Sequence, residues 1–421
     1  MPVSRVSFSA SPDAGIHTAG ATLRRGRIAE EKAVHRERVL PFGVAQPRFL
    51  SELERMQRAD REPAPGIDAD PGGSTPIPPL DLRAAVRLLR EPSPCPDELL
   101  DRARRLTDEV FGRSILLFAP CYLSSFCVNH CLYCGFRFPA GGKRRFLSPD
   151  EAMDQIRFLA GRGMRRILLV TGEYPRLVTA EYLAGIIARG RTLGLELSVE
   201  VAPGPTRFYR RLVRAGAEGV VCYQEVYDRR EYALLHPRGP KSRFAFRLGA
   251  LERAGAAGMK RLGLGVLLGM SADPVRQVVS LIAHVRFLAR LFPAAHITVS
   301  LPRLRPAVAS FEPAAVVDDE TLLRFFCVLR LALPRAGLVL STRESAGMRR
   351  RLLQAGITQM SAGSVTVPGG YGAPGDDLGQ FAIADRRSIP EVVADLEARG
   401  YAVRWTLRSR STRLCRGRDR G

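Results

Sequence analysis

Short apolar runs alternate with helix-like segments along most of the chain, from about residue 80 onward. Each run is rich in leucine or β-branched residues and is apolar at odd and even positions alike, which is typical of strands buried on both faces. Eight such strands, each followed by a helical segment, predict an α/β fold of the (β/α)8 TIM-barrel type. An open doubly wound sheet is the alternative, but the count of eight and the lack of a Gly-x-Gly-x-x-Gly motif after the first run favour the barrel. The runs occupy residues 114–124, 165–173, 195–203, 219–227, 261–269, 296–304, 337–344 and 358–366.

Capping signals mark several helix ends. Ser148-Pro149-Asp150-Glu151 has the form of a capping box with proline at the first helical position, which predicts that a helix begins there. Other helical segments close on Ala-Gly or Arg-Gly just before the next apolar run, where glycine suits a helix C-cap.

The chain divides into three parts by composition. Residues 1–79 are rich in Arg, Pro and Gly and predict a largely disordered extension, with one short helical stretch near residues 49–61. Residues 80–400 carry the barrel pattern. Residues 401–421 form a basic C-terminal tail.

Composition narrows the class of protein. No apolar run is long enough to span a membrane, and the N-terminus has no apolar signal-peptide region, so we expect a cytoplasmic protein without a membrane partner. In a reducing compartment, eight cysteines indicate metal ligands or buried thiols rather than disulfides. The net charge of +22 comes almost entirely from arginine, because only 4 of the 64 basic residues are lysine. These arginines are scattered and not interleaved with aromatic residues, so we expect no nucleic-acid partner.

Polar and charged side chains gather where the predicted strands end. In a (β/α)8 barrel, the carboxyl ends of the strands form the rim on which active sites are built. The sequence therefore predicts an active site on this rim. The rim residues are Tyr122, Thr171-Gly172-Glu173, Glu200, Tyr223-Gln224-Glu225, Arg303, Arg305, Ser341-Thr342-Arg343-Glu344 and Ser361.

Three cysteines follow the first predicted strand within eight positions. They are Cys127, Cys131 and Cys134 in the stretch FCVNHCLYCGF. Half of a zinc site, completed by His130 or a distant cysteine, is one interpretation, but no second Cys-x-x-Cys occurs. A 4Fe–4S cluster held by three thiolates is the other, and it leaves one iron open for a substrate or cofactor.

The spacing Cys-x-x-x-Cys-x-x-Cys, with an aromatic residue before the last cysteine, resembles the signature of radical S-adenosylmethionine (SAM) enzymes. The segments YLSSFCVNHCLYCGFR, LLVTGE, YQEVY, PRLRP, LSTRE and MSAGSVTVPGGY together resemble the ThiH/HydG/NosL group of radical SAM lyases. This resemblance runs from about residue 82 to residue 400. It implies a TIM barrel of the radical SAM superfamily, with a 4Fe–4S cluster and S-adenosylmethionine as cofactors.

The resemblance also implies an activity. In the ThiH family, the Cα–Cβ bond of L-tyrosine is cleaved to 2-iminoacetate (dehydroglycine) and p-cresol, which supplies the thiazole branch of thiamine biosynthesis. We expect the same of this chain, with a flavodoxin or ferredoxin as electron donor and thiazole synthase ThiG as a candidate partner. A tryptophan lyase of the NosL type, or a paralogue acting on another aromatic amino acid, is the alternative.

Cofactor roles follow from the matching positions. Cys127, Cys131 and Cys134 would hold the cluster. Glu173 would meet the amino group of SAM and Arg247 its carboxylate, although Arg247 could also be a solvated helix residue. Gly263 and Gly265 would let the backbone approach the adenine, or could instead close a crowded barrel. Tyr133 and Glu225 are the remaining residues predicted for the cofactor.

Substrate roles are carried over in the same way. Arg343 would clamp the carboxylate of the amino acid, as a guanidinium can with two parallel hydrogen bonds. Tyr122 and Ser361 match positions that line the substrate amine, and each could be a satisfied rim side chain instead. We interpret Arg303 and Arg305 as ion-pair partners of Glu200 and Glu225.

Two features depart from the group. HydG also makes carbon monoxide and cyanide with a second cluster on C-terminal cysteines, whereas after Cys327 this chain has only Cys415. The ThiH family usually ends in Trp-Lys-Asp-Trp, of which only Trp405 remains here. The first departure argues against the HydG activity, and the second leaves the aromatic substrate open.

Overall fold

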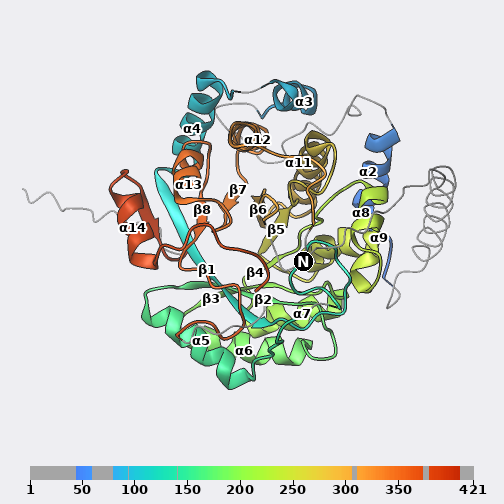
Figure 1. The fold of residues 1–421 in the computed structure, drawn as a ribbon, viewed down its shortest axis with the longest axis vertical. Helices are drawn as coiled ribbons and strands as arrows, with labels where there is room; N and C mark the ends of the chain where they lie inside the picture. Colours follow the sequence, from blue (N-terminus) through green and yellow to red (C-terminus); the bar gives the residue numbers. More distant parts are fainter. Residues whose placement is uncertain are drawn as a thin grey trace, which may run out of the picture.

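Eight parallel strands close into a barrel at the centre of the molecule, which confirms the predicted fold (Figure 1). The computed structural model describes residues 44–58 and 79–407, with gaps at 93, 140, 306–310 and 373–378. Strands follow one another around the barrel in chain order, and the first pairs with both the second and the eighth. They are β1 (Ser114–Ser124), β2 (Arg166–Thr171), β3 (Glu196–Glu200), β4 (Gly219–Val221), β5 (Arg261–Gly265), β6 (His296–Ser300), β7 (Gly337–Leu340) and β8 (Gln359–Ser361).

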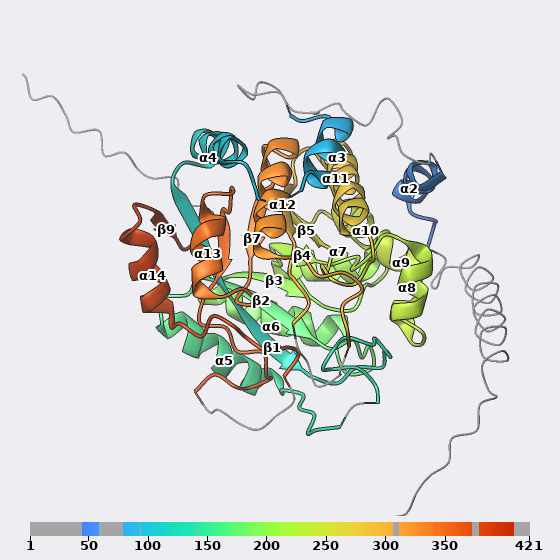
Figure 2. The ribbon, with the colours of Figure 1, turned by 45° about the horizontal axis from the view of Figure 1, so that its top comes forward.

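Helices surround the barrel on its outside (Figures 1 and 2). The helix after β1 begins at the predicted capping box, in which Ser148 and Glu151 bond each other's backbone N–H groups. The outer elements are α3 (Leu82–Arg90), α4 (Asp97–Phe111), α5 (Pro149–Gly161), α6 (Ala180–Thr192), α7 (Thr206–Ala215), α8 (Arg229–Leu235), η2 (Pro240–Ser242), α9 (Phe244–Leu248), α10 (Ala250–Ala256), α11 (Pro274–Leu291), α12 (Asp319–Ala332), α13 (Ala346–Leu353) and α14 (Ile389–Glu397).

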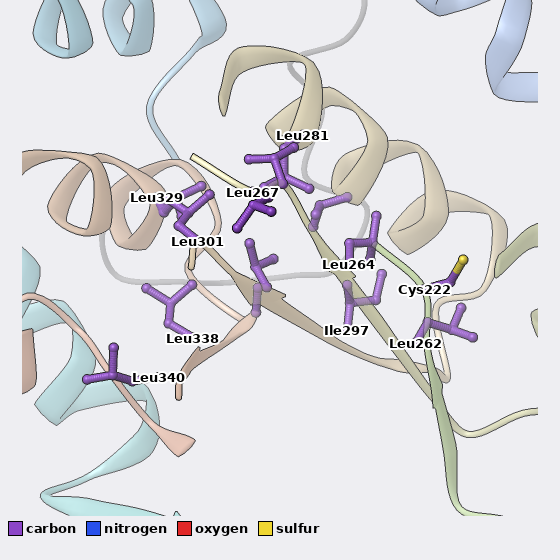
Figure 3. Close-up of a cluster of buried hydrophobic side chains, with 14 of the residues drawn as sticks. Cys222, Leu262, Leu264, Leu267, Leu281, Ile297, Leu301, Leu329, Leu338 and Leu340 are labelled. Atoms are coloured by element: carbon purple, nitrogen blue, oxygen red, sulfur yellow. The ribbon is translucent and has the colours of Figure 1, made fainter. Parts of the chain in front are cut away.

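The hydrophobic core lies between the strands and the helices. Alternate residues such as Leu262 and Leu264 of β5 point outward and are buried with leucines of neighbouring elements (Figure 3). The alternating residues on the other face of each strand point inward. Gly263 of β5, Thr298 of β6 and Val339 of β7 line the interior of the barrel in this way. This two-sided burial explains why the runs are apolar at both parities.

One helix of the N-terminal extension, α2 (Arg48–Arg58), packs beside α9 and α11. Phe49 and Leu53 are fully buried, and Phe49 stacks on His284 with ring centroids 4.3 Å apart. Glu252 accepts hydrogen bonds from the first two backbone N–H groups of the helix. This is the short helical stretch that the sequence predicts, whereas residues 1–43 and 59–78 of the predicted disordered extension lie outside the described residues.

A ninth strand, β9 (Ala402–Arg404), pairs with the beginning of β1. Ordered structure therefore continues beyond the boundary predicted at residue 400, as far as Leu407, whose backbone N–H bonds Glu196. The remainder of the predicted basic tail lies outside the described residues.

Several arginines serve the fold itself. Arg330 is fully buried and donates hydrogen bonds to four backbone carbonyls, those of Leu333, Pro334, Ala336 and Gly356. Arg324 bonds the carbonyls of residues 91, 92 and 94 in the same manner. Part of the high arginine content thus closes loops and helix ends instead of charging the surface.

Candidate active site

The cysteine loop leaves β1 at the carboxyl rim and is tied to the neighbouring loops by its backbone. Val128 donates to the carbonyl of Glu173 at the end of β2, and His130 and Leu132 donate to carbonyls of the 235–238 segment. Gly172 must lack a side chain, because a Cβ there would lie 2.3 Å from the carbonyl oxygen of Phe126. The Thr-Gly-Glu motif and the cysteine loop are therefore built as one unit.

Cys127, Cys131 and Cys134 lie on this loop, and their thiols act on one another electrostatically. Backbone N–H groups of Asn129 and Phe136 point at the sulfurs of Cys127 and Cys134, at 3.5 and 3.4 Å. Among the described residues, no three Cys, His, Asp or Glu side chains are gathered closely enough to hold a single ion. A cubane takes each thiolate on a different iron, so its ligands stand apart.

Burial raises the pKa of all three thiols, that of Cys134 to about 11, and the nearby Lys241 opposes the rise. These side chains need strongly positive partners to be thiolates, and the irons of a cluster would supply that charge. The donor set, the N–H groups aimed at sulfur and the adjacent lysine therefore fit a 4Fe–4S cluster.

Beside the loop, Glu173 and Arg247 form an ion pair of 2.7 Å. Asn129, between two of the cysteines, donates its side-chain amide to the other carboxylate oxygen of Glu173 at 2.8 Å. Burial opposes the charge of Glu173, but Arg247 and Lys241 outweigh it and hold the pKa of this carboxyl below its ordinary value. An anion and a cation side by side match the ammonium and carboxylate of an amino acid, so the pair fits the methionine part of SAM. The structure brings together these two predicted residues, and Arg247 is buried instead of solvated.

Glu225 completes this network from the end of β4. It accepts a bond from Lys241 at 2.8 Å, and its carboxylate lies 3.9 Å from Arg247. Its backbone has φ of 70°, a left-handed conformation that few non-glycine residues adopt and that is concentrated at functional sites. The adjacent Gln224 has a buried side-chain nitrogen without a partner among the described residues. Both observations point to a ligand site at the end of β4.

The other residues predicted for the cofactor are committed to protein contacts. The Tyr133 hydroxyl lies 2.9 Å from His236. Beside Gly263, the space is filled by Val221 and Thr298, and beside Gly265 it is filled by the ring of Tyr223. The packing interpretation is consistent with these contacts, and a role of either glycine toward the adenine stays a prediction.

We call the opening of the barrel at the carboxyl ends of its strands the mouth. The predicted substrate residues lie there, toward the ends of β1, β7 and β8. Arg343 stacks over Phe381 with its guanidinium carbon 3.5 Å from the ring centroid, and no acidic side chain in the described part of the chain pairs with it. Ser361 is buried, and its hydroxyl finds no partner among the described residues. The Tyr122 hydroxyl donates to Gln380 at 2.7 Å.

The interpretation of Arg303 and Arg305 was wrong. Both bond Glu344 at the end of β7 and not Glu200 or Glu225. The ends of β6 and β7 are neighbours, which puts Glu344 within reach, and Arg303 also pairs with Asp319 at 2.8 Å.

Sequence reasoning missed several site residues. Lys241 comes from η2, which does not follow directly on any strand in the sequence. Gln380 and Phe381 come from the segment after β8. A signal for Lys241 was present, because it is one of 4 lysines beside 60 arginines. For Gln380 and Phe381 we find no signal in the sequence.

A cavity lies in the barrel interior. Its lining includes aliphatic residues such as Leu168, Val221 and Val339 and the hydroxyl-bearing Tyr223 and Ser300. It also includes Arg166 and Arg261, which both pair with Glu196 at the amino ends of their strands. The apolar and hydroxyl-bearing part would suit a ring with a polar substituent. Among the described residues, no helix is long and apolar enough to cross a membrane.

Comparison with known proteins adds to this geometry. The Radical SAM superfamily model matches residues 121–282, and the Biotin and Thiamin Synthesis associated domain matches residues 300–402. Two curated 2-iminoacetate synthases align over 309 residues, which are 73% of this chain and 82% of each relative. The protein from Escherichia coli (strain K12) is 36% identical, and that from Salmonella typhimurium is 35% identical.

Among solved structures, the FeFe-hydrogenase maturase HydG from Carboxydothermus hydrogenoformans superposes with a TM-score of 0.73 at 31% identity. The match covers 95% of this chain and 88% of that chain. The barrel, the three-cysteine loop and these likenesses agree: the chain belongs to the 2-iminoacetate synthase family of the radical SAM superfamily.

Proposed function

We propose that this protein is a radical SAM lyase that cleaves the Cα–Cβ bond of L-tyrosine to 2-iminoacetate and p-cresol, for the thiazole branch of thiamine biosynthesis. The observation that carries the proposal is the likeness to 2-iminoacetate synthases over 82% of their length, which includes the cysteine loop. Arg343, which has no acidic partner among the described residues, and the cavity in the barrel interior support an amino-acid substrate.

Cys127, Cys131 and Cys134 would hold the cluster, while Glu173 and Arg247 would bind the amino and carboxylate groups of SAM. When bound, these cofactors supply a 5′-deoxyadenosyl radical that takes a hydrogen atom from the substrate. Lys241 bonds Glu225 and, together with Arg247, favours the charged form of Glu173, so these residues support the charges that would meet SAM.

On the substrate side, Arg343 would hold the carboxylate of tyrosine. The Ser361 hydroxyl, which has no protein partner among the described residues, would face the substrate. The side chain would enter the cavity, where Tyr223 and Ser300 could receive a phenol hydroxyl. Holding the reacting atoms on strand ends limits their motion, which favours one cleavage over others.

A reduced flavodoxin or ferredoxin would deliver the electron, and the net charge of +22 would favour such a partner if it is acidic. Thiazole synthase ThiG would receive the 2-iminoacetate. A reducing cytoplasm is the location that suits three free thiols and an oxygen-sensitive cluster.

The test is anaerobic reconstitution with iron and sulfide, followed by product analysis with L-tyrosine and, separately, with L-tryptophan. We expect p-cresol and glyoxylate, the hydrolysis product of 2-iminoacetate, from tyrosine. Indole-type products from tryptophan, with none from tyrosine, would assign the protein to the tryptophan-lyase alternative. A protein without the cluster, made by omitting iron, controls for non-enzymatic breakdown.

A further inference from the structure

Glu200, the last residue of β3, carries a carboxylate without a bonding partner among the described residues. It is only partly exposed, yet none of the residues that the structure describes gives it a hydrogen bond or an ion pair. Other acids near the barrel are paired with arginine or lysine. These are Glu173, Glu196, Glu225, Glu344 and Asp385.

Its surroundings place Glu200 at the substrate end of the mouth. It pairs with Val170 of β2, and it is the charge that most strongly affects the hydroxyls of Tyr122 on β1 and Tyr223 after β4. The charged groups that act on it are Glu225, Arg343, Arg247 and Lys241. Arg343 is the other charged side chain of the mouth for which we find no ion-pair partner among the described residues.

An amino acid presents a carboxylate and an ammonium on one carbon, and the mouth presents an unused guanidinium and an unused carboxylate. We propose that Glu200 binds the α-ammonium of the substrate while Arg343 holds its carboxylate, and that Glu200 then accepts one proton from that ammonium. This inference rests on the proposed function and adds a residue to it.

The transfer prepares the amine for hydrogen-atom abstraction. One N–H bond of the ammonium breaks, an O–H bond forms on the carboxylate, and no electron changes hands. The neutral amine keeps its electron pair, so losing a hydrogen atom gives a neutral aminyl radical instead of a charged one. The base has to be on the protein, because a buried site excludes bulk water.

The environment of Glu200 suits this role. Burial, and then the neighbouring Glu225, raise the pKa of this carboxyl to about 7, against the opposing effect of Arg343. A carboxyl with a pKa of about 7 binds a proton roughly 300-fold more tightly than one at its ordinary 4.5, so the proton transfer from the ammonium is less unfavourable by that factor.

The test is a binding cycle on the cluster-loaded protein with SAM and without reductant, so that no turnover occurs. Wild type and Glu200→Gln are titrated with L-tyrosine and with 3-(4-hydroxyphenyl)propionate, which lacks only the amine. Loss of one charge-assisted hydrogen bond should weaken tyrosine binding about 10- to 100-fold in the variant, with little change for the analogue. Glu181→Gln, the same change on the exposed face of α6, is the control and should alter neither.

A second readout is the pH dependence of tyrosine affinity. Because only ionised Glu200 attracts the ammonium, wild-type affinity should rise as the pH passes through about 7 and then level off, and the variant should lack this rise. A purely structural role would not produce such a difference.

Equal losses for tyrosine and the analogue, or no loss for either, would overturn the inference. A loss of SAM affinity, with the tyrosine-to-analogue ratio unchanged, would assign Glu200 to the cofactor and also overturn it. If wild type binds tryptophan instead of tyrosine, the proposed substrate fails, and the same cycle with tryptophan and indole-3-propionate decides the role of Glu200. If wild type binds neither amino acid, both proposals fail.

Discussion

Two arginines near the mouth allow function and stability to be separated by mutation. Arg343 is half-buried and stacks on Phe381 without an acidic partner among the described residues. Arg349, on α13, is almost fully buried, pairs with Asp385 and donates to the carbonyl of Ser361 at 2.5 Å. We expect Arg343→Ala to weaken substrate binding strongly in a stable protein, and Arg349→Ala to destabilise the protein.

The magnitudes follow from these contacts. Arg343→Ala loses a cation–π contact of about 0.5–1 kcal/mol and leaves no ion-pair partner behind, so the free energy of unfolding should change by about 1 kcal/mol or less. Two charge-assisted hydrogen bonds to a substrate carboxylate are worth about 1.5 kcal/mol or more each, so tyrosine should bind roughly a hundred-fold more weakly. Arg349→Ala breaks a buried pair, which costs about 3–5 kcal/mol, and the lower end applies because Arg387 still bonds Asp385 at 2.7 Å.

The assay combines thermal unfolding with the ratio of p-cresol to 5′-deoxyadenosine. Arg343→Ala should unfold within about 2 °C of wild type and still cleave some SAM, but without p-cresol. Arg349→Ala should unfold several degrees lower, with activity that follows its folded fraction. Arg343→Lys should recover little, because an ammonium cannot form two parallel bonds. Wild-type p-cresol output from Arg343→Ala, or a loss of stability equal to that of Arg349→Ala, would refute the reasoning.

Two further predictions concern the cofactors. Replacing Cys127, Cys131 and Cys134 together by alanine should remove the reconstituted cluster, whereas Cys415→Ser should keep four irons per chain; iron analysis near eight in wild type would contradict a single cluster. Glu173→Gln should weaken SAM binding about 10- to 100-fold and also lower the free energy of unfolding, because it leaves Arg247 buried without its closest acid. Unchanged SAM affinity in a calorimetric titration would remove Glu173 from the cofactor site.

The barrel could be predicted from the sequence because its signals are local. Each strand is a short run buried on both faces, and each of the eight predicted runs contains an observed strand. Strand ends also locate rim residues without knowledge of side-chain contacts, and in this way Glu173, Glu225 and Arg343 could be placed near one another. The closed sheet then brings these ends together whatever their separation in sequence.

Partners across the rim could not be predicted in the same way. Arg303 and Arg305 were assigned to Glu200 and Glu225, but which acid an arginine reaches depends on the order of the strands and on side-chain length. Lys241 reaches Glu225 from η2, a short element between α8 and α9 that carries no strand end. Such contacts depend on loop paths, for which the chain carries only weak local signals.

The arrangement of charges offers a reason why SAM and substrate could occupy one mouth without exchanging places. Both carry an ammonium and a carboxylate, and the mouth has one glutamate and one arginine for each of them. The pair Glu173 and Arg247 is already joined at 2.7 Å and must open for its ligand, whereas Glu200 and Arg343 are not bonded to each other. Glu225 lies between the two sets, bonded to Lys241, near Arg247, and raising the pKa of Glu200. Charge at the pair Glu173 and Arg247 is therefore coupled to Glu200, because Arg247 and Glu225 both act on the pKa of that carboxyl. By linkage, any change that SAM binding makes in the affinity for the substrate must equal the change that the substrate makes in the affinity for SAM, so titrating either one with and without the other measures this coupling.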